Sequence, residues 1–517
     1  MAHCAAGWNR KAILGLGLLL QASFSLCVPA AHAADALGVR RITAKNTVYP
    51  FGGLAISGDR IVWTDVRYSG CASNYDCDLL PDPNLEIFQY NLATKIESRV
   101  TARAGRDTVQ DLDGDWLIYL QHPRYGESTP QPFKLIARNL KVGGEIVIRS
   151  TPNFVGEFSS AADFARAADG KVVWIEGITG STTTPTTQVY VYDLASKTTT
   201  QITNSTSFKT QPDISGFGVV WLSTVPGLNM PATLNVYDLQ SKQTGALPGV
   251  YTNGGRYVGR TGPRVFADKI VATNSDMDTI LFERTSTGFQ SRKISEGLES
   301  QWGAVVGKNM ALWEKVVRSV YGYPADNHIM GYDIQRSKLV TITDAAQYKS
   351  KLDTDGNRNV WIDGRNDKLV PNQVFVTGWR DIYLYDPADA PDLTVKSLVP
   401  SASLVVPGHS ITVTDTTANI GKRTAPASVT VYHLLAISRS GTAEEPVMKA
   451  VTRAVPALAA NAQNSGKVII SIPATLPGGS YSLCARADMN DSVIEADETN
   501  NKTCTAISVA RTGGIVF

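Results

Sequence analysis

The sequence has few of the local motifs that identify a catalytic or metal site. After the first 33 residues it holds four histidines, none at the spacing of a metal-binding pair: His122, His328, His409 and His433. It has no glycine-rich phosphate loop, no dinucleotide-binding fingerprint and no G-x-S-x-G nucleophile elbow. These absences exclude the enzyme classes that depend on such motifs, and no catalytic residue is assigned. They leave open a glycosidase, whose two carboxylates meet in space without a local motif.

Neither sign of charge dominates the chain. It has 49 basic residues and 47 acidic residues. Arg10 and Lys11, which lie in the N-terminal segment described next, account for the difference. The remaining chain is formally neutral, which argues against nucleic acid or an anionic membrane surface as its partner.

Long apolar runs are absent except near the N-terminus. There, a short basic region precedes an apolar run over residues 12–28, and the small residues Ala-His-Ala follow at 31–33. This order predicts a secretory signal peptide over residues 1–33. Gln21 and nearby serines interrupt the run, so it is a poor membrane-spanning helix and no membrane insertion is expected. We therefore expect a secreted protein, located in the periplasm, at the cell surface or outside the cell.

Cysteine is scarce, and two of the six cysteines fall in the signal segment. The others are Cys71, Cys77, Cys484 and Cys504. An even number in an exported chain predicts disulfides rather than metal ligands. Three pairings are possible, and Cys71–Cys77 with Cys484–Cys504 is the simplest. The first would close a surface loop, and the second would bridge two neighbouring strands.

What the sequence does contain is a repeat of about 50 residues. Each copy has a turn, an apolar strand, a variable loop, a Tyr-rich strand that ends in Asp or Asn, and a Thr-rich strand. One position near the end of the apolar strand marks each copy: Trp63, Tyr119, Trp174, Trp221, Ala272, Trp313 and Trp361. The pattern predicts an all-β protein with a seven-bladed β-propeller over residues 34–388. The copy around Ala272 is degenerate, so six blades are the alternative.

The two ends of the repeat complement each other. Residues 39–43 resemble the closing strand of a copy, whereas the last copy ends near Asp386 without one. We therefore expect the N-terminal strand to complete the last blade and close the ring. The repeated tryptophans are expected to pack one blade on the next, and the repeated Asp residues to begin Asx turns. The pattern resembles secreted propellers of the TolB and WD40-like kind, a resemblance that carries no activity with it.

A different pattern begins after residue 388. Residues 389–511 contain short alternating strands, typical of an immunoglobulin-like sandwich, and residues 512–517 form a tail. The Pro391 opening, the turn at 419–421, the approach at 478–481 and the acidic stretch 488–501 resemble the cell-adhesion-related domain of bacteria, CARDB. The resemblance implies an accessory domain on a surface or secreted protein.

The acidic stretch could hold a cation. It places five carboxylates close together: Asp488, Asp491, Glu495, Asp497 and Glu498. Extracellular Ca²⁺ prefers such oxygen ligands, although their spacing differs from that of an EF-hand loop. The alternative is a solvated hairpin with no metal.

Two short sequences in the propeller suggest a ligand site. Asp65 with Arg67, and Asp363 with Arg365, follow the marker Trp in the first and last copies, which are neighbours in a closed ring. They could grip an anionic or hydroxylated ligand, or they could tie one blade's loop to the next. Two loop tyrosines could stack on a sugar: Tyr321 and Tyr323.

These features lead us to expect a secreted binding protein. The propeller would be the binding platform for an extracellular carbohydrate, a cell-surface polymer or a protein, with an Ig-like accessory domain. A propeller hydrolase or lyase acting on extracellular polysaccharide is one alternative. A structural component of the cell envelope is another.

Overall fold

The structure is a computed structural model of the chain. It describes residues 38–45, 47–49, 52–71, 83–123, 132–151, 164–177, 186–225, 231–251, 262–297, 299–320, 323–345, 347–366, 380–436 and 445–510. Across these ranges, no helix has the length and apolar character needed to cross a membrane. The signal peptide predicted over residues 1–33 lies outside the described residues.

The N-terminal part of the described chain forms seven four-stranded antiparallel sheets, each a blade. Blades 1 to 4 are β2 (Leu54–Ser57), β3 (Arg60–Asp65), β4 (Glu86–Asn91), β5 (Ile96–Arg99); β6 (Asp107–Asp113), β7 (Trp116–Gln121), β8 (Phe133–Asn139), β9 (Glu145–Thr151); β10 (Ala165–Ala168), β11 (Lys171–Gly177), β12 (Thr187–Asp193), β13 (Thr198–Gln201); and β14 (Phe208–Ile214), β15 (Gly218–Thr224), β16 (Thr233–Asp238), β17 (Thr244–Ala246).

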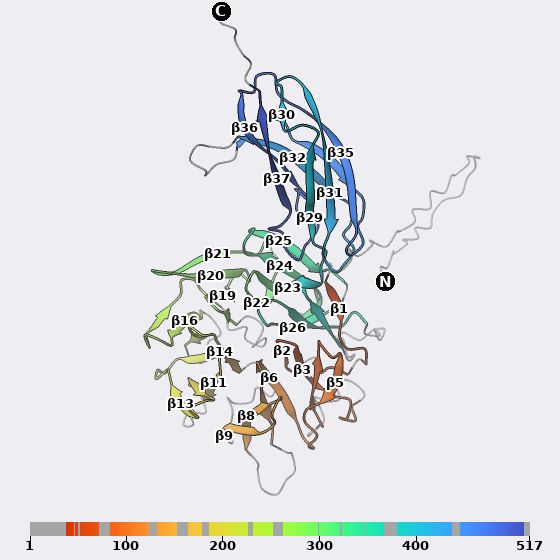
Figure 1. The fold of residues 1–517 in the computed structure, drawn as a ribbon. Helices are drawn as coiled ribbons and strands as arrows, with labels where there is room; N and C mark the ends of the chain where they lie inside the picture. Colours follow the sequence, from red (N-terminus) through yellow and green to blue (C-terminus); the bar gives the residue numbers. More distant parts are fainter. Residues whose placement is uncertain are drawn as a thin grey trace, which may run out of the picture.

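Blades 5 to 7 continue the same order. They are β18 (Arg264–Phe266), β19 (Lys269–Thr273), β20 (Thr279–Thr285), β21 (Gly288–Lys293); β22 (Gln301–Val306), β23 (Met310–Val320), β24 (Tyr323–Asp333), β25 (Lys338–Thr343); and β26 (Lys349–Thr354), β27 (Asn359–Asp363), β28 (Asp381–Tyr385) with β1 (Val39–Arg41). The first strand of each blade contacts the first strands of both neighbouring blades, and β26 contacts β2. These inner strands therefore form a closed ring around a central channel (Figure 1).

The N-terminal strand completes blade 7, as the sequence predicted. Strand β1 pairs antiparallel with β28, with Val39 opposite Tyr385. The backbone N–H of Ile42 donates to the carbonyl of Ile382 over 2.8 Å. The Arg41 side chain pairs with the buried carboxylate of Asp381. The first and last parts of the propeller chain are thus joined in one sheet, and β1 covers the edge that β28 would otherwise present.

The repeated residues hold the blades together, as predicted. The marker residue of each blade lies in the same buried cluster as residues of the preceding blade; Trp361, for example, packs with Leu312 and Ile329 of blade 6. The carboxylate of Asp193 accepts the backbone N–H groups of Ala195 and Ser196, which is an Asx turn. The same acceptor role recurs at four equivalent or related positions: Asn91, Asp238, Asp333 and Asp386.

The C-terminal part is a β-sandwich, which confirms the predicted fold class. One sheet has β29 (Leu393–Pro400), β31 (Ser410–Asn419) and β35 (Gln463–Ser471). The other has β30 (Leu404–Val405), β37 (Lys502–Val509), β36 (Gly479–Arg486), β32 (Ser428–Ala436) and β33 (Glu445–Pro446), with β34 (Val451–Val455) paired to β32. Apolar side chains from both sheets form one core, with Leu393, Tyr432 and Leu483 fully buried. A one-turn 3₁₀ helix, η2 (Pro387–Asp389), connects the propeller to this sandwich.

The two faces of the propeller differ. Because strand direction alternates, the connections between second and third strands and between successive blades lie on one face, here called the loop face. The turns within the first and last strand pairs of each blade lie on the other, the turn face. The sandwich contacts the turn face of blade 6, where Lys338 donates to the backbone carbonyl of Asp491. In Figure 1 the sandwich lies beyond blade 6, next to β25.

Candidate functional site

The inner strands of four blades have a bulge, and in three of them, β14, β22 and β26, the bulge has a residue with a left-handed backbone. The pairing register shifts at Gln211 in β14, at Gly303 in β22 and at Lys351 in β26. All three residues have left-handed backbones, with φ of 55°, 59° and 59°. This conformation costs a residue with a side chain about 1–2 kcal/mol, so Gln211 and Lys351 are strained. Bulges and strain of this kind re-aim side chains and cluster at functional sites.

The three bulges line one cavity, here called the channel mouth. Its volume is about 50 Å³, and Arg166, Arg264, Glu314 and Ser350 contribute to its wall. Glycine is favoured at 303 by its left-handed φ and by space, because a Cβ there would lie 2.8 Å from Oε1 of Glu314, whose side chain would have to shift. The wall thus offers amide, guanidinium, ammonium, carboxylate and hydroxyl groups, which can bond a ligand rich in hydroxyls.

Beneath the channel mouth lies a ring of side chains from one equivalent position in every blade. In every blade, this residue lies on the first strand and pairs across the sheet with the residue just before the marker residue on the second strand. The seven residues are Ala55, Asp111, Arg166, Asp213, Arg264, Val305 and Asp353. Arg264 bridges Asp213 at 3.2 Å and Asp353 at 2.6 Å, and Arg166 lies 4.0 Å from Asp111. Buried charges need such partners, so this charged ring fixes how the inner strands meet.

The acids of the charged ring also join successive blades through the backbone. Asp111 accepts the N–H of Ala167 in blade 3 over 2.8 Å, and Asp353 accepts that of Ile56 in blade 1 over 2.9 Å. Asp213 does the same with Val265 in blade 5, over 2.8 Å. These charge-assisted bonds make the charged ring a scaffold that positions the bulges above it.

Three acids and two arginines leave the charged ring one proton short of neutral. Burial, together with the nearby charge of Asp353, raises the pKa of Asp111 to about 7 despite the opposing charge of Arg166. Burial raises the pKa of Asp353 as well. Near neutral pH the charged ring is therefore close to gaining the proton that balances it.

This predicts a pH-dependent stability of the propeller. An unfolded Asp loses its proton near pH 3.9, whereas folded Asp111 holds it to about pH 7. Unfolding therefore releases a proton in that window, and stability falls as pH rises from about 4 to 7, by on the order of 4 kcal/mol from this group. We expect Asp111→Asn, which cannot ionise, to flatten this slope in denaturant titrations. Asp193→Asn, a change in an exposed turn, should leave it in place; an unchanged slope in D111N would refute the assignment.

The Arg–Asp pairs predicted as ligand contacts lie in the scaffold. Asp65 is buried, accepts the indole N–H of Trp63 over 2.8 Å and forms a bidentate salt bridge with Arg67. The Arg67 guanidinium lies 3.8 Å from the centre of the Phe88 ring. Blade 7 repeats this arrangement with Trp361, Asp363, Arg365 and Tyr383. Arg365 also donates to Thr343 of blade 6 over 3.1 Å. This geometry favours the structural alternative, and a ligand role for these four residues stays a prediction.

The other predicted residues are placed as follows. Tyr321 lies outside the described residues, as do the side chain of Tyr323 and the whole of Cys77. Cys71 is disulfide-bonded. Cys484 and Cys504 stand directly opposite each other on β36 and β37 and are bonded, which confirms that predicted pair.

The five carboxylates of the acidic stretch each have their own partners. Asp488 accepts from Ser492 and Val493, Asp491 pairs with Arg486, and Asp497 accepts from Thr499. Glu495 accepts the N–H of Leu393, and Glu498 accepts that of Glu495. Within the described ranges, no group of three or more His, Cys, Asp or Glu side chains could hold a metal ion. The structure therefore does not bring the predicted calcium ligands together.

Solved structures to which parts of this chain are similar share little sequence identity with it. The CARDB domain of a Pyrococcus furiosus protein, solved with di-metal ions, is 21% identical, covers 23% of this chain and 90% of that chain, and has a TM-score of 0.18. An oligogalacturonate lyase solved with manganese is 11% identical, covers 69% and 94%, and has a TM-score of 0.44. TolB from Acinetobacter baumannii is 12% identical, covers 57% and 66%, and has a TM-score of 0.34.

No curated protein matches the chain. The family model of CARDB matches residues 390–505, which span the sandwich described above. The C-terminal domain of this chain is therefore a CARDB domain, attached to an all-β propeller.

Proposed function

We propose that this protein is a secreted binding protein whose propeller recognises an extracellular carbohydrate or cell-surface polymer at the channel mouth. The observation that carries the proposal is the convergence of three left-handed bulges, from blades 4, 6 and 7, on one cavity whose wall includes charged and polar groups. Strained backbone persists only where the surrounding structure holds it, and here the charged ring does so. The CARDB domain, on the turn face, acts as an accessory domain.

The polar wall supports a hydroxylated ligand. Gln211, Ser350 and Glu314 offer amide, hydroxyl and carboxylate groups, and Arg166 and Lys351 add cations. Sugar hydroxyls both donate and accept, so a mixed set of donors and acceptors suits them. The residues that repeat in every blade bind their own neighbours, so specificity rests with these residues, which differ between blades.

The structure allows a matched test of this site. Replacing Lys351 by glycine removes its side chain and its strain, of about 1–2 kcal/mol, at an entropic cost of about 0.5–1 kcal/mol. Lys351→Gly should therefore be as stable as the parent or slightly more so. The oligosaccharide ligand is first selected from a panel by calorimetry. Lys351→Gly should bind this oligosaccharide at least ten-fold more weakly than the parent protein does.

Lys197→Gly is the control, because Lys197 has a similar φ of 56° in an exposed turn of blade 3. It should show the same stability change with unaltered affinity. Equal affinity in parent and Lys351→Gly would reject the channel mouth as the binding site. Release of shorter saccharides by the purified protein would instead favour the hydrolase or lyase alternative.

A further inference from the structure

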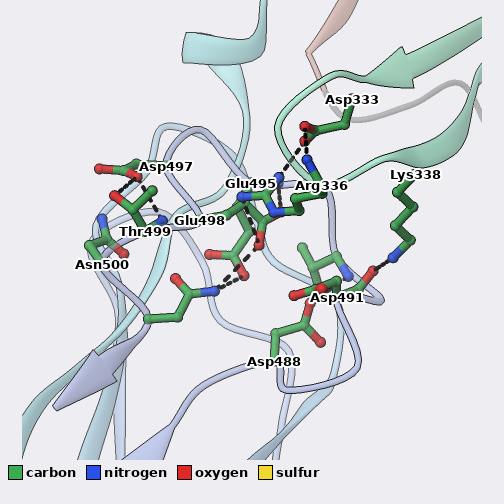
Figure 2. Close-up of polar contacts among 12 residues, drawn as sticks. Asp333, Arg336, Lys338, Asp488, Asp491, Glu495, Asp497, Glu498, Thr499 and Asn500 are labelled. Carbon is green, nitrogen blue, oxygen red and sulfur yellow. Dashed lines mark hydrogen bonds and ion pairs between the residues drawn. The ribbon is translucent and has the colours of Figure 1, made fainter. Parts of the chain in front are cut away.

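A second cleft lies between the two domains, on the turn face and away from the channel mouth. It has a volume of about 720 Å³ and is lined by residues of blades 6 and 7 and of the acidic stretch. From the propeller come the turns at Asn309, at 333–338 and at 356–358. Figure 2 shows Arg336 and Lys338 facing the loop that carries Asp491, Glu495 and Glu498. Clefts of this size at domain boundaries are common ligand sites.

The cleft contains more acids than bases. The lining acids are Asp333, Asp386, Asp491, Glu495, Asp497 and Glu498, and the lining bases are Arg336, Lys338 and Arg358. Arg358 bonds Asp59 and Asp355, neither of which lines the cleft. Lys338 donates to a backbone carbonyl rather than to a carboxylate. Among the lining cations, Arg336 pairs with lining carboxylates, Asp333 at 2.5 Å and Glu498 at 3.8 Å. The lining acid Asp491 pairs with Arg486, which lies outside the lining, at 2.8 Å.

The surplus of acid affects the groups in the wall. Burial and the charges of Glu498, Asp488 and Asp392 raise the pKa of Glu495 to about 8. Burial and the charges of Asp491 and Asp488 raise the pKa of Glu498, against the opposing charge of Arg336. Both carboxyl groups are therefore harder to ionise than an ordinary glutamate, chiefly because they are buried and secondarily because other acids lie near them.

A second observation also points to an occupant. Tyr385 lines the cleft and is fully buried, and its hydroxyl has no hydrogen-bond partner among the described residues. Buried hydroxyls are nearly always bonded, so an unpartnered one in a cleft wall indicates a missing partner. Burial and the charges of Asp333, Asp386 and Glu498 raise the pKa of this hydroxyl, so it stays protonated and can donate.

We propose that the cleft binds a cationic saccharide, one whose sugar units carry free primary amines. The ammonium groups would pair with the carboxylates of Asp386 and Asp497, and the hydroxyls would bond Asn357, Thr499 and the Tyr385 hydroxyl. Most of the wall consists of turns and a loop, and β25, the outer strand of blade 6, adds Lys338, Leu339 and Val340. Asn357, Thr499 and Tyr385 can bond sugar hydroxyls, which lysine side chains lack, so a saccharide uses these walls more fully than a lysine-rich peptide does.

The test is calorimetry of the full-length protein with a tetramer of β-1,4-linked glucosamine. The amine form should bind, and its fully N-acetylated form should bind at least ten-fold more weakly. The double variant Asp386→Asn with Asp497→Asn should weaken binding at least ten-fold, because it removes two charges while the amides keep the turn hydrogen bonds that both acids accept. Asp193→Asn, which also removes one exposed charge from a turn, should not.

Four results would overturn the proposal. They are no binding of the amine form, equal binding of the acetylated form, full affinity in the double variant, and tighter binding of tetralysine than of the saccharide. The test is independent of the channel mouth, since Lys351→Gly should leave binding in the cleft unchanged. Failure at one site therefore does not imply failure at the other.

Discussion

Removal of residues 38–45 is expected to lower the melting temperature of the propeller by about 10 °C and to promote self-association. Without β1, strand β28 presents an open edge, and Asp381, which is fully buried, loses both Arg41 and Thr43 as partners. Breaking a buried ion pair alone costs about 3–5 kcal/mol, and an open strand edge recruits other chains. Scanning calorimetry and size-exclusion chromatography of the shortened chain measure both effects.

A synthetic peptide supplies the control for this deletion. Added to the shortened protein, a peptide of residues 34–50 should restore the melting temperature in a concentration-dependent way, because a ligand that binds only the folded state stabilises it by mass action. A peptide with Arg41 and Thr43 replaced by alanine should restore less. A shift below 2 °C on deletion would contradict a closure that depends on β1.

Arg264→Met is expected to destabilise the propeller by about 3–5 kcal/mol at pH 7.5, since it leaves Asp213 and Asp353 in the channel without the cation that bridges them. The loss should be smaller at pH 5, where the stranded acids can take up protons. Adding Asp353→Asn to this variant should recover part of the stability. Denaturant titrations at the two pH values give all three results.

The matched control is Arg284→Met. Arg284 pairs with Asp238 at 2.6 Å, with side chains 40% and 20% exposed, on the outer part of the propeller. Exposed pairs of this kind contribute about 1 kcal/mol or less. Equal losses in the Arg264 and Arg284 variants would mean that the charged ring does not hold the channel.

The architecture could be predicted from the sequence because its determinants repeat. A buried tryptophan such as Trp361 and an Asx-turn residue such as Asp193 recur at similar intervals, since each blade solves the same packing problem. The role of residues 39–43 followed from the missing closing strand of the last copy. The Cys484–Cys504 pair followed from two cysteines in neighbouring strand sequences. Local chemistry was enough in each case.

The candidate site could not be predicted, because it is made by positions at which the blades differ. Asp111, Arg166 and Asp353 occupy one equivalent position, and a search for similarity treats such differences as variation. The sequence did contain a signal of the charged ring. The ring position of the repeat alternates between acidic and basic residues through blades 2 to 5. The left-handed backbone of Lys351 had no such signal, since lysine does not favour it and the neighbouring strands impose it.

The acidic stretch shows how placement changes the interpretation of residues. Five carboxylates in a short segment suggested calcium, but they bond to donors of the protein, and no three of these described side chains meet in a group that could hold a metal ion. Two of them, Asp491 and Glu498, also belong to the wall of the interdomain cleft (Figure 2). Blade 6 lies distant from this segment in the sequence, so only the fold reveals that they face Arg336 and Lys338.

Hydrogen–deuterium exchange with a bound oligosaccharide tests the central claim most directly, that binding occurs at the non-repeating channel mouth. The account predicts slowed exchange around Gln211, Gly303 and Lys351, in β14, β22 and β26, with the outer strands of the same blades unchanged. Protection confined to outer strands or to the turn face, with none at these three bulges, would contradict it.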